Sequence, residues 1–583
     1  MIMYERSGVL LQQKFREYLI PTILTVVALL ATTIIDSIIV GHLLGETALS
    51  TIGLTSPVIY SFNAIFVLFV VGGVTCASIA RGRRETDNSN SYFTLTFLVG
   101  MVVMSLFTLI LLLFTNPIAN ALAQGDDLLA SLTRDYLRPL VFMGPVMMLI
   151  MGTAQFVRAD GKPKISARIA LTANIINLIL TYIFIRFMGM GIGGASLANV
   201  CGYLTAFVVL IPYIRSKERG FRFHKPVKGC VKQVLEMMNT GSPKALTHGL
   251  SFLRGLVLNA IIVSALGVQG MAAMMICINS LLFATVFIGG TTETLLPIVG
   301  TLFGEKDYPG IRFTVRTGFR FMVIACLAVM ALFLILPGYV VQIFGITEGL
   351  KIAESALRLY ALSLPFYGIN TLLLNYYQTT GRVKLANLIV TLNGFALVVL
   401  FAFAFSIINA DLIWLSFALS ELITFIIVMI AGLRIRKKSN LKGVLLLAGE
   451  SEGISLDLSI PATNEAAVGI SAQIINFLNE NNIEEKSAMR MGIAVEEMAV
   501  NTAKYGHRNS KGLIDVLIRI VEGDLILRLR DNGEHFDPTQ YYPEEVNDFA
   551  IGGIEIVRRL AKDINYSRQL GFNISVITIA KES

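Results

Sequence analysis

Apolar runs long enough to cross a lipid bilayer recur along most of this 583-residue chain. A membrane-spanning helix needs about 20 consecutive, mostly apolar residues. Only 15% of the residues are charged, whereas soluble proteins carry about 25%. We therefore predict an all-α polytopic membrane domain with twelve spans, at 18–40, 54–80, 92–115, 132–156, 165–187, 193–214, 243–266, 271–302, 315–338, 355–378, 384–406 and 411–433.

The loops between the predicted spans alternate in charge. One set is rich in Lys and Arg, notably at 81–84, 158–168, 215–232 and 434–438, whereas the other set is nearly free of basic residues. Basic loops stay on the cytoplasmic side of a membrane. Both termini are therefore predicted to be cytoplasmic, and a miscounted span would break this alternation.

The two halves of the predicted membrane domain repeat. Gly161 lies between the fourth and fifth spans and Gly381 between the tenth and eleventh, and Asn residues follow both of them in the next span. Six plus six similar spans are typical of transporters, which handle substrate between the halves near the middle of the membrane. Repeat one is placed at about 1–214 and repeat two at about 240–438, within a transporter domain at 1–438.

Several segments resemble the multidrug and toxic compound extrusion (MATE) transporters. The segment 35–45 reads IDSIIVGHLLG and 48–53 reads ALSTIG, similar to the family's first span, while 297–307 resembles the end of its eighth span. Arg158 to Gly161 and 174–180 resemble its fourth and fifth spans, so the resemblance covers about 5–438. It implies a cation-coupled antiporter of a bacterial cytoplasmic membrane, which exports drugs or other organic compounds while Na⁺ or H⁺ enters.

The resemblance also names candidate transport residues. Asp36 matches the family's cation-site Asp, and an ionisable group inside a bilayer is costly enough to be a functional candidate by default. Asn174 and Asn177 match positions that place polar oxygens near that Asp. The structural alternatives are an Asp36 pair with a neighbouring Lys or Ser, and helix–helix hydrogen bonds for the two Asn. Thr181 stands where many members carry a second acid, which leaves the choice between Na⁺ and H⁺ open.

Two further acids lie inside predicted spans. Glu293 in the eighth span is included among the candidate transport residues, and Glu421 lies in the twelfth. An ion pair of Arg254 with either of them is the structural alternative.

The last part of the chain differs in charge from the rest. From residue 450 to 583, 13 Lys and Arg stand against 21 Asp and Glu, a net charge of −8, whereas the preceding residues carry 35 and 19, a net charge of +16. Alternating apolar residues predict strands at 454–461, 513–521 and 524–530. Helical spacing predicts helices at 464–479, 485–505 and 554–561. We predict an α+β domain at 453–583, joined to the spans by a basic linker at 439–452.

Motifs in this domain resemble the GHKL (Bergerat-type, histidine kinase-like) ATPases, especially the serine kinases that act as bacterial anti-sigma factors. In the first motif Glu497 and Asn501 lie one helical turn apart on the same face, and Lys504 follows. The resemblance makes Glu497 the catalytic group that polarises the attacking hydroxyl. It makes Asn501 a Mg²⁺ ligand, consistent with the oxygen ligands that Mg²⁺ prefers, and Lys504 an ATP-binding residue.

Two later motifs complete the predicted ATP site. Asp531 is expected to accept a hydrogen bond from the adenine amine, and Gly533 to let the chain turn close to the base. Gly552 and Gly553 are expected to begin a helix whose backbone amides meet phosphate, although Ile551 replaces the first Gly of that pattern. The implied cofactor is ATP with Mg²⁺.

The chain lacks the G-x-x-x-x-G-K-[ST] phosphate loop, and the resembled transporters draw on ion gradients. The ATP domain is therefore predicted to regulate transport rather than to power it. One alternative is a membrane-tethered, anti-sigma-like serine kinase or switch that uses the spans as a sensor and binds an anti-anti-sigma-like protein. Another is a flippase for lipid or polysaccharide precursors. No nucleic-acid partner is expected.

Overall fold

The computed structural model describes residues 6–580 apart from 124–125, 218, 226–228, 344–349, 440, 442, 448–453, 507–511, 522–523 and 541–548. The chain divides into two compact units. A helical unit comprises Phe15–Asp307 and Thr314–Lys438. A sheet unit comprises Met1–Lys14, Tyr308–Phe313 and Ser439–Ser583. The sheet unit thus combines the C-terminal domain with the first residues of the chain.

The helical unit has the architecture that the apolar runs predict. Among the described residues, ten helices are long and apolar enough to cross a membrane, or twelve if two bent helix pairs each count as one span. The predicted all-α membrane domain is therefore confirmed. Its helices are α1 (Val9–Leu44), α2 (Glu46–Leu54), α3 (Ser56–Gly82), α4 (Thr86–Leu113), α5 (Thr115–Ala123), α6 (Asp127–Leu140), α7 (Met143–Ala159), α8 (Pro163–Arg186), α9 (Gly191–Thr205), α10 (Phe207–Arg215), α11 (Cys230–Gly304), α12 (Tyr308–Ile335), α13 (Pro337–Ile343), α14 (Leu350–Ala361), α15 (Leu364–Thr379), α16 (Val383–Thr391), α17 (Leu397–Ile408) and α18 (Leu415–Ser439).

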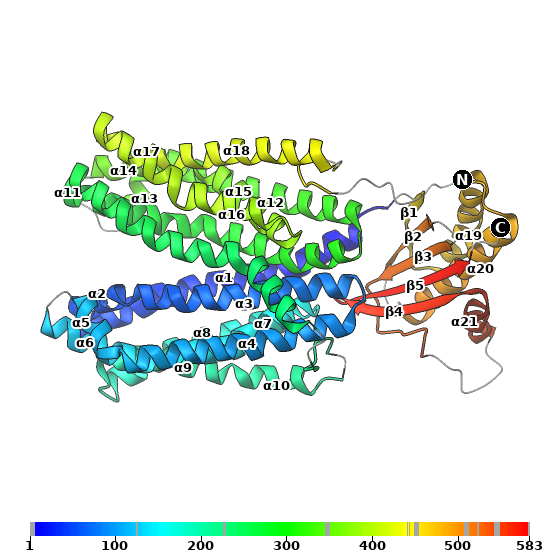
Figure 1. Ribbon diagram of the computed structural model, residues 1–583, viewed down its shortest axis with the longest axis horizontal. Helices are drawn as coiled ribbons and strands as arrows, with labels where there is room; N and C mark the ends of the chain where they lie inside the picture. The colour runs from blue at the N-terminus through cyan, green and yellow to red at the C-terminus, as the bar shows by residue number, and fades with distance from the viewer. Residues whose placement is uncertain are drawn as a thin grey trace. The chain divides into compact units, whose positions relative to one another are not determined.

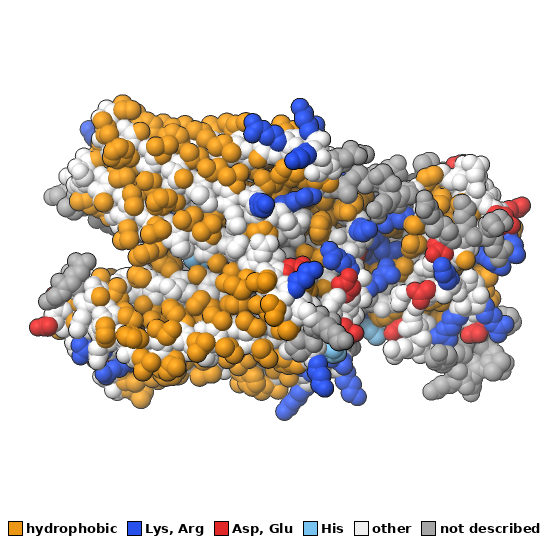
Figure 2. Space-filling model, in the orientation of Figure 1, with side chains coloured by type: hydrophobic (Ala, Val, Ile, Leu, Met, Phe, Trp, Pro, Cys, Tyr) orange, Lys and Arg blue, Asp and Glu red, His pale blue; other side chains and the backbone are white. Residues whose placement is uncertain are grey.

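Helices α1 to α10 form one half of this unit and α11 to α18 the other (Figure 1). The backbone of α11 breaks at Gly267, which has φ 62°, so this one long element contains two spans. A short π-helical turn at Leu392–Ala396, called a π-turn below, joins α16 to α17. Apolar side chains cover much of the outer surface, as expected for contact with lipid (Figure 2).

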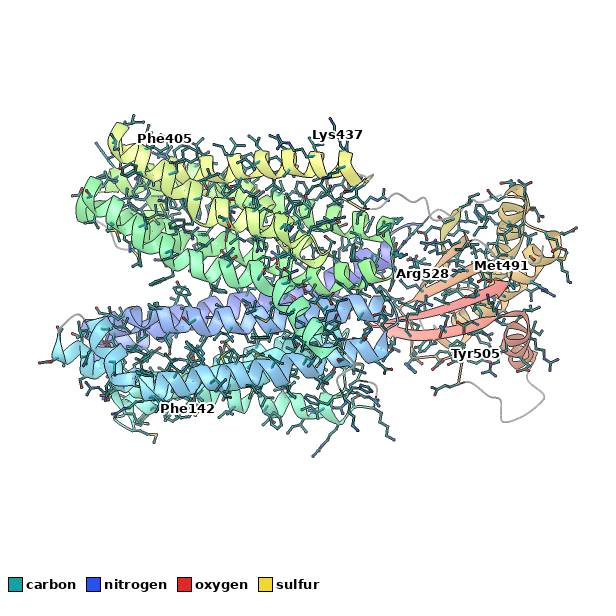
Figure 3. All side chains as sticks on the ribbon, in the orientation of Figure 1. Phe142, Phe405, Lys437, Met491, Tyr505 and Arg528 are labelled. Carbon is teal, nitrogen blue, oxygen red and sulfur yellow. The ribbon has the colours of Figure 1, made fainter. Side chains whose placement is uncertain are left out.

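The two halves meet closely near one end of the helical unit. There α3 approaches α11 so tightly that a Cβ on Gly82 would lie 2.1 Å from the Thr301 carbonyl oxygen. Small residues allow such close backbone contact between membrane helices. Lys437 and Phe405 mark opposite ends of the unit (Figure 3). The surface is hollowed between the halves at the Phe405 end (Figure 2), so the unit is closed at its basic end and open at the other.

The sheet unit holds a five-stranded antiparallel sheet in the order β1-β2-β3-β5-β4. The apolar side chains of one face, including Val516, Leu527 and Ile577, are buried in a core with the helices α19 and α20. The predicted α+β class is confirmed. The elements are β1 (Ser455–Pro461), α19 (Asn464–Glu480), α20 (Glu485–Asn501), a π-turn (Thr502–Gly506), β2 (Leu513–Val521), β3 (Asp524–Asp531), α21 (Phe549–Leu560), β4 (Asp563–Gln569) and β5 (Phe572–Ala580).

Two element boundaries differ from the prediction. The helix predicted over 485–505 ends at Asn501, and the π-turn takes up its last residues. The helix predicted to start at Ile554 instead starts at Phe549. Gly552 and Gly553 therefore lie inside the first turns of α21. The helix continues through both glycines although glycine has a low helix propensity.

The opposite face of the sheet binds the N-terminal segment of the chain, residues 6–14. Arg6 Nη1 lies 2.9 Å from Asp457 Oδ2, and Arg6 Nε lies 3.6 Å from Asp515 Oδ2. The Ser7 amide donates to Ser459 Oγ at 3.0 Å. The Lys14 ammonium lies 4.9 Å from the centre of the Phe572 ring. These contacts hold the first residues of the chain on β1, β2 and β5.

Candidate functional site

Asp36 lies on α1 with a carboxylate that is partly withdrawn from the surface. Its Oδ1 atom is buried and has no hydrogen-bond partner among the described residues. The Thr181 side chain of α8 lies near this carboxylate, but its hydroxyl also has no hydrogen-bond partner among the described residues. The Tyr136 side chain of α6 lies near the carboxylate as well. Within the described part of the chain, no basic side chain forms an ion pair with Asp36. The Lys alternative for this residue is therefore not supported.

Asn177, one turn before Thr181 on α8, is buried, and both polar atoms of its side chain lack a partner among the described residues. Asn174 is half-buried one turn earlier on the same helix. Buried polar groups are usually hydrogen-bonded, so each exception calls for an explanation. The unpaired oxygens of Asn177 and Asp36 are of the type that hard cations prefer. Helix–helix hydrogen bonding, the structural alternative for Asn177, is not formed with any of the described residues.

Glu293 does not join this group. Its Oε2 lies 3.3 Å from Arg158 Nη1 and its Oε1 lies 3.4 Å from Lys244 Nζ. Arg158 is on α7 in the first half, whereas Glu293 and Lys244 are both on α11 in the second. Glu293 therefore links the two halves through an ion pair, and its partner is Arg158 rather than Arg254.

The first ATP motif of the sheet unit lies on α20. Asn501 is 1% exposed, and its Nδ2 atom has no partner among the described residues. Glu497 is one turn earlier, as the spacing predicts. Burial and then the neighbouring Glu496 carboxylate raise the pKa of Glu497. A carboxylate with a raised pKa holds a proton more readily, which suits a general base.

Asp531 ends β3 and is held in a fixed orientation. Its Oδ1 accepts hydrogen bonds from the Gly533 amide at 2.7 Å and from Asn573 Nδ2 at 3.0 Å. Asn573 is directly opposite Asp531 on β5. It also donates to the Glu534 carbonyl at 2.7 Å and accepts from the Tyr566 hydroxyl at 2.8 Å. Burial raises the pKa of Tyr566, which keeps that hydroxyl protonated as a donor.

Two glycines of the ATP motifs, Gly533 and Gly553, lie so close to neighbouring atoms that no side chain would fit there. A Cβ on Gly533 would lie 2.2 Å from the Gly506 carbonyl oxygen, so this residue packs on the backbone after α20. A Cβ on Gly553 would lie 1.9 Å from Glu497 Oε2. The third motif therefore meets the first one directly, and α21 lies against α20. Gly552 is known only as a helical residue of α21.

Aromatic rings border the same region. Tyr505, labelled in Figure 3, stacks on Phe536 with ring centres 5.5 Å apart. Lys504 precedes it, with its ammonium 5.2 Å from the centre of the Tyr505 ring. Glu497, Asn501, Asp531, Gly533 and Gly553 are thus gathered where α20, the end of β3 and the start of α21 meet.

Comparison with known proteins identifies both parts. The MatE family model matches residues 21–183 and 243–408. The chain belongs to the MatE family. The model of the histidine kinase-like ATPase domain matches residues 460–579, so the sheet unit contains such a domain. The predicted fusion of the two is confirmed.

Relatives of this MatE protein are similar over the helical part. The multidrug export protein MepA of Staphylococcus haemolyticus is 26% identical over 366 residues, which are 62% of this chain and 80% of that protein. MepA of Staphylococcus aureus is 25% identical over 375 residues, 63% of this chain and 81% of that protein. A solved mutant of the Vibrio cholerae MATE transporter VcmN superposes with a TM-score of 0.70 at 19% identity, covering 75% of this chain and 99% of that one. An outward-facing MATE family transporter gives 0.65 at 18% identity, over 73% and 96%.

Sequence reasoning missed two features of these sites. Asn573 is not among the residues that the sequence singles out, yet it is a side chain that orients Asp531. The stack of Tyr505 on Phe536 was not predicted. Strand register could have suggested the first, but both contacts depend on residues far apart in the chain.

Proposed function

We propose that this MatE protein is an exporter of organic compounds driven by a Na⁺ or H⁺ gradient, and that its ATPase domain regulates transport. The observation that carries the first part is the buried Asp36 oxygen, which has no hydrogen-bond partner among the described residues and lies near Thr181 of α8. One turn before Thr181 on the same helix, the buried amide of Asn177 also lacks a partner among these residues. Such a set binds a cation or proton at low cost, because these polar atoms have no hydrogen-bond partner in the described part of the chain. Multidrug export by the MepA relatives supports the cargo class.

We place the protein in a cytoplasmic membrane with its basic end inside, following the positive-inside rule. In this orientation the hollow between the halves opens outward, and the closed end faces the cytoplasm (Figure 2). The ion pair of Glu293 with Arg158, which joins the two halves, then helps to close the cytoplasmic side. Export requires an alternation between this arrangement and one in which that ion pair is broken.

The residues of the ATPase domain fit ATP with Mg²⁺. Asp531 is a buried acceptor that two donors hold in place, as required to read the adenine amine. Asn501 supplies an amide beside Glu497, and bound Mg²⁺ would contribute charge neutralisation of the phosphates. The first backbone amides of α21 have no intrahelical partner and suit phosphate.

Regulation would pass through the N-terminal segment. Arg6 and Ser7 bind the sheet that carries Asp531, and α1 runs as one helix from Val9 to Leu44, past Asp36. A shift of the sheet on ATP binding would therefore act on the helix that holds the proposed ion site. ATP changes transport only if its affinity differs between two conformations of the transporter.

The test is gradient-driven dye efflux from proteoliposomes, with and without ATP and Mg²⁺ on the side of the ATPase domain. Wild type should export under the gradient alone and change its rate with ATP. Arg6→Ala should keep the gradient-driven rate and ATP affinity but lose the ATP effect. Arg16→Ala, which changes an exposed charge at the start of α1, is the control. An ATP effect of equal size in Arg6→Ala would exclude this route.

A second function, serine kinase activity on a partner protein, is favoured by one observation. The raised pKa of Glu497 suits a base that accepts a hydroxyl proton. Incubation of the protein with labelled ATP and a candidate serine-containing partner, beside Glu497→Gln, distinguishes a kinase from a domain that only binds nucleotide.

A further inference from the structure

A buried carboxylate lies in the half of the helical unit that does not contain Asp36. Glu421 on α18 is 7% exposed. Asn370 of α15, which is fully buried, donates its Nδ2 to Glu421 Oε2 at 2.6 Å and to the Glu421 carbonyl oxygen at 2.8 Å. Asn393 donates to Oε1 at 3.2 Å and to Oε2 at 3.1 Å.

The charge of this carboxylate has no close counterpart. Within the described residues, no basic side chain lies within 4 Å of Glu421, although Arg254 of α11 is near enough to act on it at longer range. The other titratable groups that face it are Tyr360 of α14 and Tyr367 of α15. Two neutral amides thus hold an acid in a span, where an uncompensated charge is expensive.

The local backbone is built around this contact. Asn393 lies in the π-turn that interrupts the helix between α16 and α17. Such π-helical turns are rare in proteins, and those that do occur are often found at functional sites. The first half has a comparable arrangement, since Thr181 of α8, the fifth span of repeat one, lies near Asp36, and residues 383–408, which contain Asn393, are the fifth span of repeat two. Each half therefore places a polar side chain of its fifth span near an acid inside the helical unit.

We infer that Glu421, Asn370 and Asn393 form a second ion-binding site of this transporter, and that its ligand is a proton. The donor geometry decides between proton and metal cation. Asn370 Nδ2 contacts two acceptors at once, which fixes the amide with its nitrogen toward the carboxylate. A Na⁺ ion would need oxygens in those positions, whereas a proton needs only one carboxylate oxygen. The inference goes beyond the proposed ion site at Asp36 and does not depend on it.

The test is infrared difference spectroscopy of the purified full-length protein, which follows the protonated carboxyl band as pH changes at constant Na⁺. Wild type should show a titrating band that Glu421→Gln lacks. Glu354→Gln is the matched control, because Glu354 lies in the same half and pairs with Arg358 instead. The band should persist in this control and in Asp36→Asn. This readout does not require transport, so it remains valid if the proposed export function fails.

Asn393→Ala keeps the acid and tests the geometry. Removing the donors of Asn393 destabilises the ionised form, so the midpoint of the Glu421 band should move up by about one pH unit. If the Glu421→Gln variant gave the same infrared difference spectrum as wild type, the proposed site would be overturned. If added Na⁺ lowered the midpoint pH of the Glu421 band in wild type, the ligand of this site would be a metal cation rather than a proton.

Discussion

Asn573→Ala tests whether the structure assigns the adenine site correctly. The substitution removes the bond from Asn573 Nδ2 to Asp531 Oδ1 at 3.0 Å and the bond to the Glu534 carbonyl at 2.7 Å. It also leaves the Tyr566 hydroxyl without its acceptor. Asp531 then keeps the Gly533 amide as a donor but loses the Asn573 donor, so its carboxylate is oriented less firmly toward the adenine amine.

The size of the effect follows from these contacts. A hydrogen bond to a charged group contributes about 1.5–3 kcal/mol. Loss of the bond between a misoriented Asp531 and the adenine amine should therefore weaken ATP binding roughly tenfold to a hundredfold. Guanine carries a carbonyl in place of that amine, so wild type should bind GTP poorly. The discrimination between ATP and GTP should shrink in Asn573→Ala.

The assay is calorimetric titration of the full-length protein in detergent with ATP and with GTP, at constant Mg²⁺. Asn565→Ala is the matched control, because Asn565 is exposed on the neighbouring strand β4 and bonds Asp563 rather than Asp531. Thermal unfolding of each variant shows whether the domain is still folded. A folded Asn573→Ala protein with wild-type affinity for ATP would refute the role of this contact.

Three further predictions concern the proposed sites. Gly553→Ala should displace Glu497, since its Cβ would lie 1.9 Å from Oε2; ATP turnover should fall more than tenfold, and calorimetry should show a smaller loss of ATP affinity. Glu496→Gln should lower the pKa of Glu497 by removing one cause of its rise. The acidic limb of the ATP turnover profile, where the base becomes protonated, should then move to lower pH, and an unmoved limb would contradict Glu497 as the base. Asp36→Asn keeps the shape of the side chain and removes its charge. Gradient-driven dye efflux should be abolished with normal expression, whereas normal efflux would exclude Asp36 as the ion site.

Local sequence patterns predicted most of the fold. The length of the apolar runs determines the spans, and alternation determines β1, β2 and β3. The start of α21 was placed five residues late, because Gly552 and Gly553 have low helix propensity. Close packing of Gly553 on Glu497 explains why a residue without a side chain stands there nevertheless.

The contacts that define the sites were harder to predict. Asp36, Asn177 and Asp531 could be named from motifs, since each motif is local. The partners of Glu421 and Asp531 could not, because they depend on which helices and strands lie side by side. The bond between Ser7 and Ser459 joins residues 452 positions apart, and no local pattern indicates that the N-terminal segment belongs to the sheet unit.

The central claim is that ion gradients drive this transporter and that ATP only adjusts it. Dye efflux from proteoliposomes under an imposed Na⁺ or H⁺ gradient, compared with efflux under ATP and Mg²⁺ without any gradient, tests it most directly. We predict efflux with a gradient and no nucleotide, a changed rate when ATP is added, and no efflux with ATP alone. Efflux that requires ATP and proceeds without any gradient would contradict the claim.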